Sequence, residues 1–161
     1  MDAAPVSALE AIQAMLAPAV GISAVGLLLL SLSSRYSTII NRIRLLNDEK
    51  RRYVRLLEER TELSYAESVR HMSVVNQSRE LLVRSRYVRN AILAMQAAIG
   101  FFVVTSIAIG LNLFITSSLL ARVPLLIFVL GMIAVLVGIV HAAVEVRRSY
   151  RIVLLEVKAE D

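Results

Sequence analysis

Cysteine is absent from this sequence of 161 residues. That absence excludes disulfides, thiolate catalysis, and zinc or iron–sulfur sites with cysteine ligands. It also excludes palmitoylation, and the N-terminus Met1-Asp2-Ala3 lacks the glycine that myristoylation needs. Any attachment to a membrane must therefore come from the polypeptide itself.

The signatures of enzyme chemistry are missing as well. The sequence has no nucleophile elbow, no phosphate-binding loop and no cluster of metal ligands, and His71 stands alone in its segment. We therefore expect no enzyme and no catalytic, cofactor-binding or metal-ligating residue. The net charge of +5 permits a nucleic acid or an anionic membrane as partner. Because no binding motif or aromatic stacking pattern accompanies the charge, we expect no nucleic-acid partner.

Charge is missing from three long stretches, 11–34, 91–121 and 123–144, which contain no Asp, Glu, Lys or Arg. About 20 apolar residues suffice to cross the hydrocarbon core of a bilayer. Hydrophobic residues make up 57% of the chain, against roughly 45–50% in soluble domains. These stretches predict transmembrane helices at about 11–34, 91–118 and 123–145, within a single membrane domain over 1–161. Pro18 lies inside the first of them and predicts a kink.

The segment 35–90 between the first two spans is strongly charged. Its first arm has apolar residues at the four–three spacing of a coiled coil, in the row Ile39, Ile43, Leu46, Tyr53 and Leu57 and in the row Tyr36, Ile40, Ile43, Val54 and Leu57. A capping-box pattern, Ser64 to Glu67, predicts the start of a second helix. That arm has a looser row, Val69, Met72, Val75, Leu81 and Leu82. We predict an antiparallel helical hairpin that buries these rows against itself or against a neighbouring subunit.

The basic residues predict the orientation. Of the 18 Lys and Arg residues, 13 lie in the charged segment and 4 in the C-terminal tail, whereas Arg122 lies alone between the second and third spans. By the positive-inside rule, the hairpin and the C-terminus are cytoplasmic and the N-terminus is outside. The predicted fold is an all-α membrane protein with three transmembrane helices, N-out and C-in, and a long cytoplasmic hairpin between the first and second spans.

Arginines gather at the three predicted cytoplasmic ends of the spans. A basic residue near an anionic leaflet contributes about 1 kcal/mol of attraction. We therefore predict contact with anionic lipid headgroups for Arg35, Arg42, Arg44, Arg84, Arg86, Arg89, Arg147, Arg148 and Arg151.

The second span carries polar residues on one helix face. The face follows four–three spacing through Ala94, Ala98, Phe101, Thr105, Ala108, Asn112 and Thr116. One interpretation is a pore lining, in which hydroxyl and amide groups replace part of an ion's hydration shell. The other is a packing face, because small residues let helices approach and Thr and Asn hydrogen-bond across them.

The third span ends with two ionisable residues, His141 and Glu145, one helical turn apart. Such a pair can relay protons inside a membrane. The alternative is that Glu145 lies at the headgroup boundary and pairs with Arg148 or Arg89, while His141 caps the cytoplasmic end.

Several short runs resemble a known family. They are Leu16 to Ser23, Leu27 to Leu30, Ser34-Arg35-Tyr36, Asn41 to Arg44, Arg89 to Ile92 and Glu145-Val146-Arg147. Together they are similar to small bacterial membrane proteins of the domain of unknown function 2721 family, from about Leu16 to Arg151. The resemblance implies a multi-pass protein of the bacterial inner membrane and carries no activity with it.

Two hypotheses for function follow. The first is a homo-oligomeric ion channel whose second spans line the path and whose hairpins hold the subunits in register. The second is a non-conducting scaffold that binds lipids or a partner protein through its basic cytoplasmic hairpin.

Overall fold

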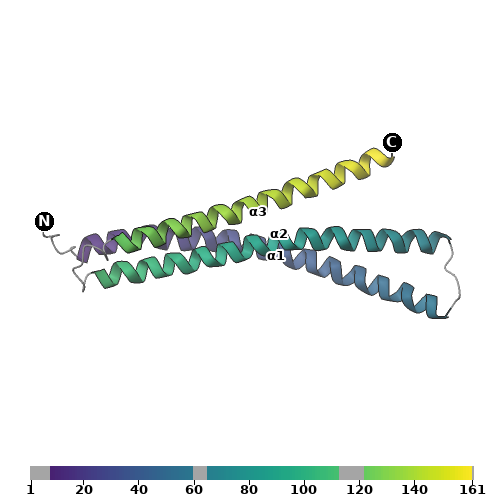
Figure 1. Ribbon diagram of the computed structural model, residues 1–161, viewed down its shortest axis with the longest axis horizontal. Helices are drawn as coiled ribbons and strands as arrows, with labels where there is room; N and C mark the ends of the chain where they lie inside the picture. Colours follow the sequence, from purple (N-terminus) through teal and green to yellow (C-terminus); the bar gives the residue numbers. More distant parts are fainter. Residues whose placement is uncertain (1–7, 60–64, 113–121, 161) are drawn as a thin grey trace. The chain divides into compact units, whose positions relative to one another are not determined.

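The computed structural model describes residues 8–59, 65–112 and 122–160, with the side chains of 8, 11, 57–59, 66 and 148–160 excepted. The described part of the chain forms three long helices, α1 (Ala8–Glu59), α2 (Tyr65–Asn112) and α3 (Val123–Glu160) (Figure 1). Each contains a segment long and apolar enough to cross a membrane. The chain is thus an all-α protein of the multi-pass membrane type, as the charge-free stretches predict.

The helices run on well past their apolar segments. The first predicted span and the first arm of the charged segment form one helix of 52 residues, because no glycine or proline separates them. Pro18 lies inside α1 with its side chain buried, and the helix continues through it. Helix α2 begins at Tyr65, where the capping-box pattern predicts a start. The predicted turn at 61–64 and the end of the second span beyond Asn112 lie outside the described residues.

Each long helix contributes to two compact units. We call residues 1–32 and 90–142 the apolar unit, and residues 33–89 and 143–161 the charged unit. The boundaries lie close to the predicted ends of the spans, where the sequence changes from apolar to charged.

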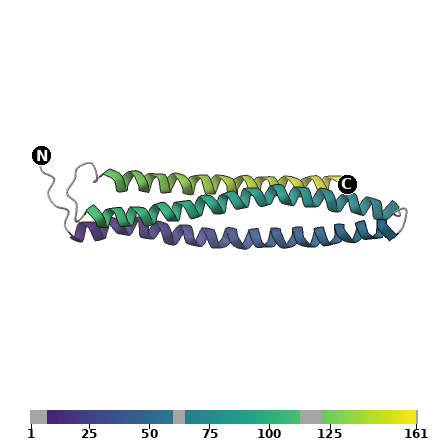
Figure 2. The same ribbon diagram turned by 60° about the horizontal axis from the view of Figure 1, so that its bottom comes forward.

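In the apolar unit, segments of all three helices lie side by side (Figures 1 and 2). The ring of Phe102 on α2 is 1% exposed and packs at 5.4 Å, between ring centroids, from Phe128 on α3. Glycines make room for it on both neighbours: a Cβ built on Gly21 of α1 or Gly131 of α3 would lie 2.9 or 2.7 Å from the ring. The remaining members of this core are Val25, Leu32, Ala91 and Met95.

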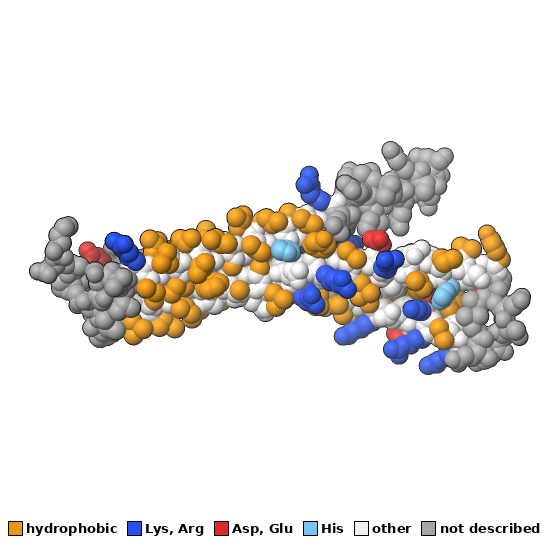
Figure 3. Space-filling model, in the orientation of Figure 1, with side chains coloured by type: hydrophobic (Ala, Val, Ile, Leu, Met, Phe, Trp, Pro, Cys, Tyr) orange, Lys and Arg blue, Asp and Glu red, His pale blue; other side chains and the backbone are white. Residues whose placement is uncertain are grey.

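The outer surface of the apolar unit is largely hydrophobic on the face that Figure 3 shows. Leu27 and Leu30 on α1, Ile107 on α2 and Leu136 on α3 are each more than half exposed. A continuous apolar surface of this kind is unfavourable in water and is what a lipid-facing surface requires.

In the charged unit, α1 and α2 lie antiparallel. Arg70 contacts Glu49, and the ring of His71 meets Tyr53 edge-on at 5.8 Å. On α1 the structure buries Ile39, Ile43 and Leu46 and half-buries Tyr53. These are four members of the first predicted row, and the side chain of the fifth, Leu57, lies outside the described residues. In the second row, Val54 is exposed.

The predicted apolar row of the second arm is only partly right, because Leu81 faces inward and Val75 is half-buried whereas the other three members are exposed. Val69, Met72 and Leu82 are exposed, whereas Val74, Ser85 and Val88 are buried. The true inward row has four–three spacing through Val74, Ser78, Leu81, Ser85 and Val88. Because two of its five members are serines, a search for apolar residues at helical spacing does not find this row. The Ser85 hydroxyl donates to the Leu82 carbonyl at 2.9 Å, and the buried Ser78 hydroxyl has no hydrogen-bond partner among the described residues.

Candidate functional site: a charge cluster on three helices

A buried carboxylate lies at the point where α3 leaves its charge-free stretch. Glu145 is the first acidic residue after that stretch, and its side chain is 6% exposed. The Nε and Nη2 atoms of Arg84 donate to its Oε1 at 3.2 and 2.9 Å. The Nη1 atom of Arg35 lies 3.9 Å from Oε2. Within the charged unit, one carboxylate therefore joins residues of all three helices.

The two arginines contribute unequally. Arg84 forms two charge-assisted hydrogen bonds and its side chain is 27% exposed, so this pair is partly shielded from water. Arg35 is 57% exposed, and its distance to the carboxylate of Glu145 is at the limit for an ion pair. Solvent screening therefore leaves this contact with little stabilising free energy. The free energy of the cluster therefore depends mainly on Arg84. A buried carboxylate without such a partner is strongly unfavourable.

The position of Glu145 was predicted, but its partners were not. Among the described residues, the partners of Glu145 are Arg84 and Arg35 rather than Arg89. The reason is helical phase: Arg84 is one turn from the buried Val88, whereas Arg89 is one residue past it and exposed. Arg84 lies four residues before Val88 and next to the buried Ser85, and it is half-buried. The side chain of Arg148 lies outside the described residues.

His141 has a local partner. Its Nδ1 atom lies 2.8 Å from the Val137 carbonyl, one turn earlier on α3. Glu145 has its contacts with Arg84 and Arg35 in the charged unit. The proton relay between His141 and Glu145 stays a prediction.

The polar face of the second span is directed inward. Thr105 is 2% exposed, and its hydroxyl donates to the Phe101 carbonyl of its own helix at 2.8 Å. Asn112 is half-buried at the end of α2, and Thr116 lies outside the described residues. Ala94, Ala98, Phe101 and Ala108 of the same face are also buried or half-buried.

Other hydroxyls of the apolar unit bond in the same way. Ser23 donates to the Ala19 carbonyl and Ser106 to the Phe102 carbonyl, each within its own helix. Such bonds satisfy a hydroxyl without a neighbouring helix or an ion. Each of these bonds uses the proton of the hydroxyl and leaves the lone pairs of its oxygen available.

The remaining arginines of the predicted headgroup set are solvent-accessible where the structure describes them. Their exposed members are Arg42, Arg44, Arg86, Arg89 and Arg147, and the side chains of Arg148 and Arg151 are not described. Figure 3 shows Lys and Arg side chains projecting from the charged unit.

A second ion pair lies further out on the hairpin. The Nε atom of Arg70 donates to Oε1 of Glu49 at 2.9 Å, and the side chains are 53% and 30% exposed. The hydrogen bond and the charge of Glu49 raise the pKa of the Arg70 guanidinium above its ordinary value. Since a raised arginine pKa keeps the group charged throughout the physiological range, this pair adds no pH dependence there.

Among the described residues, no group of three or more His, Cys, Asp or Glu side chains lies close enough to hold a metal ion. The contacts of the cluster that the structure describes are ion pairs and hydrogen bonds between side chains of different helices.

Comparison with curated proteins and with solved structures gave no significant match. A family model does match, over residues 15–155, which is most of the chain and includes Arg35, Arg84 and Glu145. The chain belongs to this family, the proteins of unknown function termed DUF2721.

Proposed function

We propose that this chain is a non-enzymatic, non-conducting membrane scaffold that presents its charged unit at the cytoplasmic surface of a membrane. There the hairpin binds lipid headgroups or a partner protein. The observation that carries this proposal is the carboxylate of Glu145, which contacts Arg84 of α2 and Arg35 of α1. A buried charge pair has one favourable geometry, so it holds the three helices in one arrangement within this unit.

The inward direction of Thr105 argues against the ion-channel hypothesis. An ion path between subunits needs polar groups on the outer surface of each subunit. Thr105 is 2% exposed, so its hydroxyl lies within a single chain and not on the outer surface. The exposed residues of α2 in the apolar unit include Leu93, Ile107 and Leu111, which suit lipid.

Ion flux into liposomes tests the choice between these functions. We expect purified protein to give no flux above that of protein-free liposomes, and Thr105→Val to change nothing. Flux that falls in Thr105→Val but persists in the lipid-facing control Ile107→Val would overturn the scaffold proposal and restore the channel. The mass of the protein in detergent should be measured in the same experiment, because the homo-oligomer is still a prediction. A monomeric mass would exclude an ion path between subunits.

Site-specific labelling tests the proposed orientation. The native chain has no cysteine, so Lys50→Cys and Arg122→Cys each introduce one thiol at an exposed position. In intact cells, we expect an impermeant maleimide to label residue 122 and to reach residue 50 only after permeabilisation. Labelling of position 50 in intact cells would place the hairpin outside the cytoplasm.

A further inference from the structure

Gln96 is a polar residue on the outer surface of the apolar unit. It is exposed on α2, seven residues after Arg89, which is the last charged residue of that helix. Seven residues correspond to about 10 Å of helix, so the amide lies well inside the charge-free stretch. Among the described residues, none forms a hydrogen bond with this amide. Lipid tails offer no hydrogen-bond partner either, so an unpaired amide at this position is strongly unfavourable.

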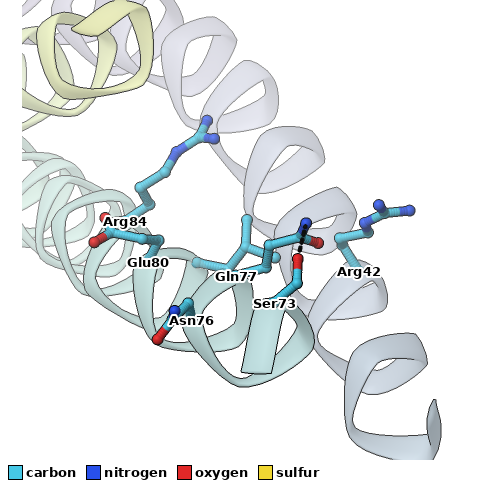
Figure 4. A pocket seen from close by; sticks show the side chains of 7 residues that line it. Arg42, Ser73, Asn76, Gln77, Glu80 and Arg84 are labelled. Carbon is cyan, nitrogen blue, oxygen red and sulfur yellow. Dashed lines mark hydrogen bonds between the residues drawn. The ribbon is translucent and has the colours of Figure 1, made fainter. Parts of the chain in front are cut away.

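Other amides of α2 satisfy their hydrogen bonds in other ways. In the charged unit, the amide of Gln77 donates to the Ser73 hydroxyl at 3.3 Å, beside an open groove (Figure 4). In the apolar unit, Asn112 at the end of the helix has a partner of its own. Gln96 therefore differs from both, because it needs a partner from outside the chain.

The surface next to Gln96 allows another helix to approach closely. Gly100 lies one turn further along α2, and a Cβ built there meets nothing within 4 Å. Val103, the next residue of this face, is 42% exposed. The three residues are spaced by four and then three positions, which is the spacing of a helix–helix seam. Small residues let two membrane helices approach, and polar side chains then hydrogen-bond across the contact.

The chemistry of the amide favours a second copy of the same chain as the partner. Copies that insert with one topology have parallel α2 helices, and a twofold axis along the membrane normal places each residue opposite its counterpart. A glutamine amide has both donors and an acceptor, so two of them can satisfy each other. A single polar residue in such a seam also specifies the register of the two helices.

We propose that two copies of this chain associate through α2, with their Gln96 amides hydrogen-bonded to each other and the helices closest at Gly100. The contact removes both amides from lipid without any change within either chain. One amide from each copy does not line a path through the membrane, so the dimer is compatible with a non-conducting protein. The association requires α2 to span the membrane, but it does not require the scaffold function.

Energy transfer in liposomes tests the association. The full chain carries one thiol, Lys50→Cys, labelled with a donor or an acceptor, and is reconstituted in phosphatidylcholine at a series of protein-to-lipid ratios. We expect transfer above the level that random proximity gives. Gln96→Leu should weaken association about tenfold, because it removes the hydrogen bonds between the helices. Gln96→Asn keeps an amide and should weaken association less.

Gln13→Leu is the matched control for the loss of an amide. Gln13 is also exposed, but it lies on α1, three residues after Glu10 and so near the end of its charge-free stretch. The substitution should change the association constant by less than twofold. Equal effects of Gln96→Leu and Gln13→Leu would overturn the proposal. So would transfer no greater than random proximity in the chain that retains Gln96, which would leave a span of another protein as its partner.

Disulfide cross-linking in the same liposomes locates the contact surface. Val103→Cys places one thiol on the proposed seam, and Leu136→Cys places one on the exposed surface of α3. Oxidation should join two chains at residue 103 and not at residue 136. The proposal is wrong if residue 136 cross-links as readily as residue 103, or if neither does. These results leave the scaffold proposal standing, because flux and labelling test it independently.

Discussion

Replacement of Arg84 by methionine is expected to destabilise the protein more than replacement of Glu145 by glutamine. Arg84→Met leaves the carboxylate of Glu145 in place, 6% exposed and without its two closest donors. Loss of one partner from a buried pair costs about 3–5 kcal/mol. Because Arg84 is itself 27% exposed and Arg35 remains nearby, we expect about 2–3 kcal/mol.

The reverse change leaves a guanidinium that can reach water. Glu145→Gln removes the negative charge but keeps the shape of the side chain, and we expect a loss of about 1 kcal/mol. The double variant Arg84→Met with Glu145→Met buries no charge at this point and should recover most of the stability. Unfolding in a defined detergent, monitored by circular dichroism, gives the three values for a double-mutant cycle.

Arg86→Met is the matched control, because Arg86 is exposed on the same helix and forms no ion pair among the described residues. It should change stability by less than about 0.5 kcal/mol. Equal losses in Arg84→Met and Arg86→Met, or additive losses in the double variant, would show that the cluster does not hold the helices together.

The positions of the helices were predictable because they depend on local composition. A stretch without charge that is long enough to cross a bilayer must form a helix to satisfy its backbone. The row Ile39, Ile43 and Leu46 was predictable for a similar reason, since burial of one helix face leaves a four–three pattern.

The partner of Glu145 was not predictable in this way. Arg84 is 61 residues away in the sequence, and its contact depends on how α2 and α3 are rotated about their axes. The inward row of α2 that sets this rotation contains Ser78 and Ser85, so hydrophobicity does not mark it. Thr105, on the predicted polar face of the second span, is buried. The direction of this face was open in the sequence, because a pore lining and a packing face have the same residues.

A second large effect is expected from one added methyl group at Gly131. A Cβ built there lies 2.7 Å from Cε1 and 2.9 Å from Cδ1 of Phe102, closer than real side chains approach. The ring has little room to move away, because its other edge packs close to the backbone of Gly21, where a built Cβ would lie 2.9 Å from Cε2. We expect Gly131→Ala to destabilise the apolar unit by about 1–3 kcal/mol through overpacking.

Two other glycines provide controls for the helix propensity of alanine. A Cβ on Gly100 meets nothing within 4 Å, so Gly100→Ala should be neutral or stabilise the helix by up to about 1 kcal/mol. A Cβ on Gly138 meets the flexible end of Met95 at 3.0 Å, so its cost should be intermediate. Thermal unfolding in detergent should therefore show Gly100→Ala as the most stable variant, Gly138→Ala as intermediate and Gly131→Ala as the least stable.

Rescue separates a steric cause from a general loss of packing. Phe102→Leu creates space beside residue 131 and should by itself be destabilising, because it removes part of a core side chain that is 1% exposed. In the Gly131→Ala background the same change should cost much less, since it relieves the contact that alanine creates. If the two losses add, or if Gly131→Ala is as stable as Gly100→Ala, then the ring of Phe102 is not held between the two glycines, and the packing proposed for the apolar unit is wrong.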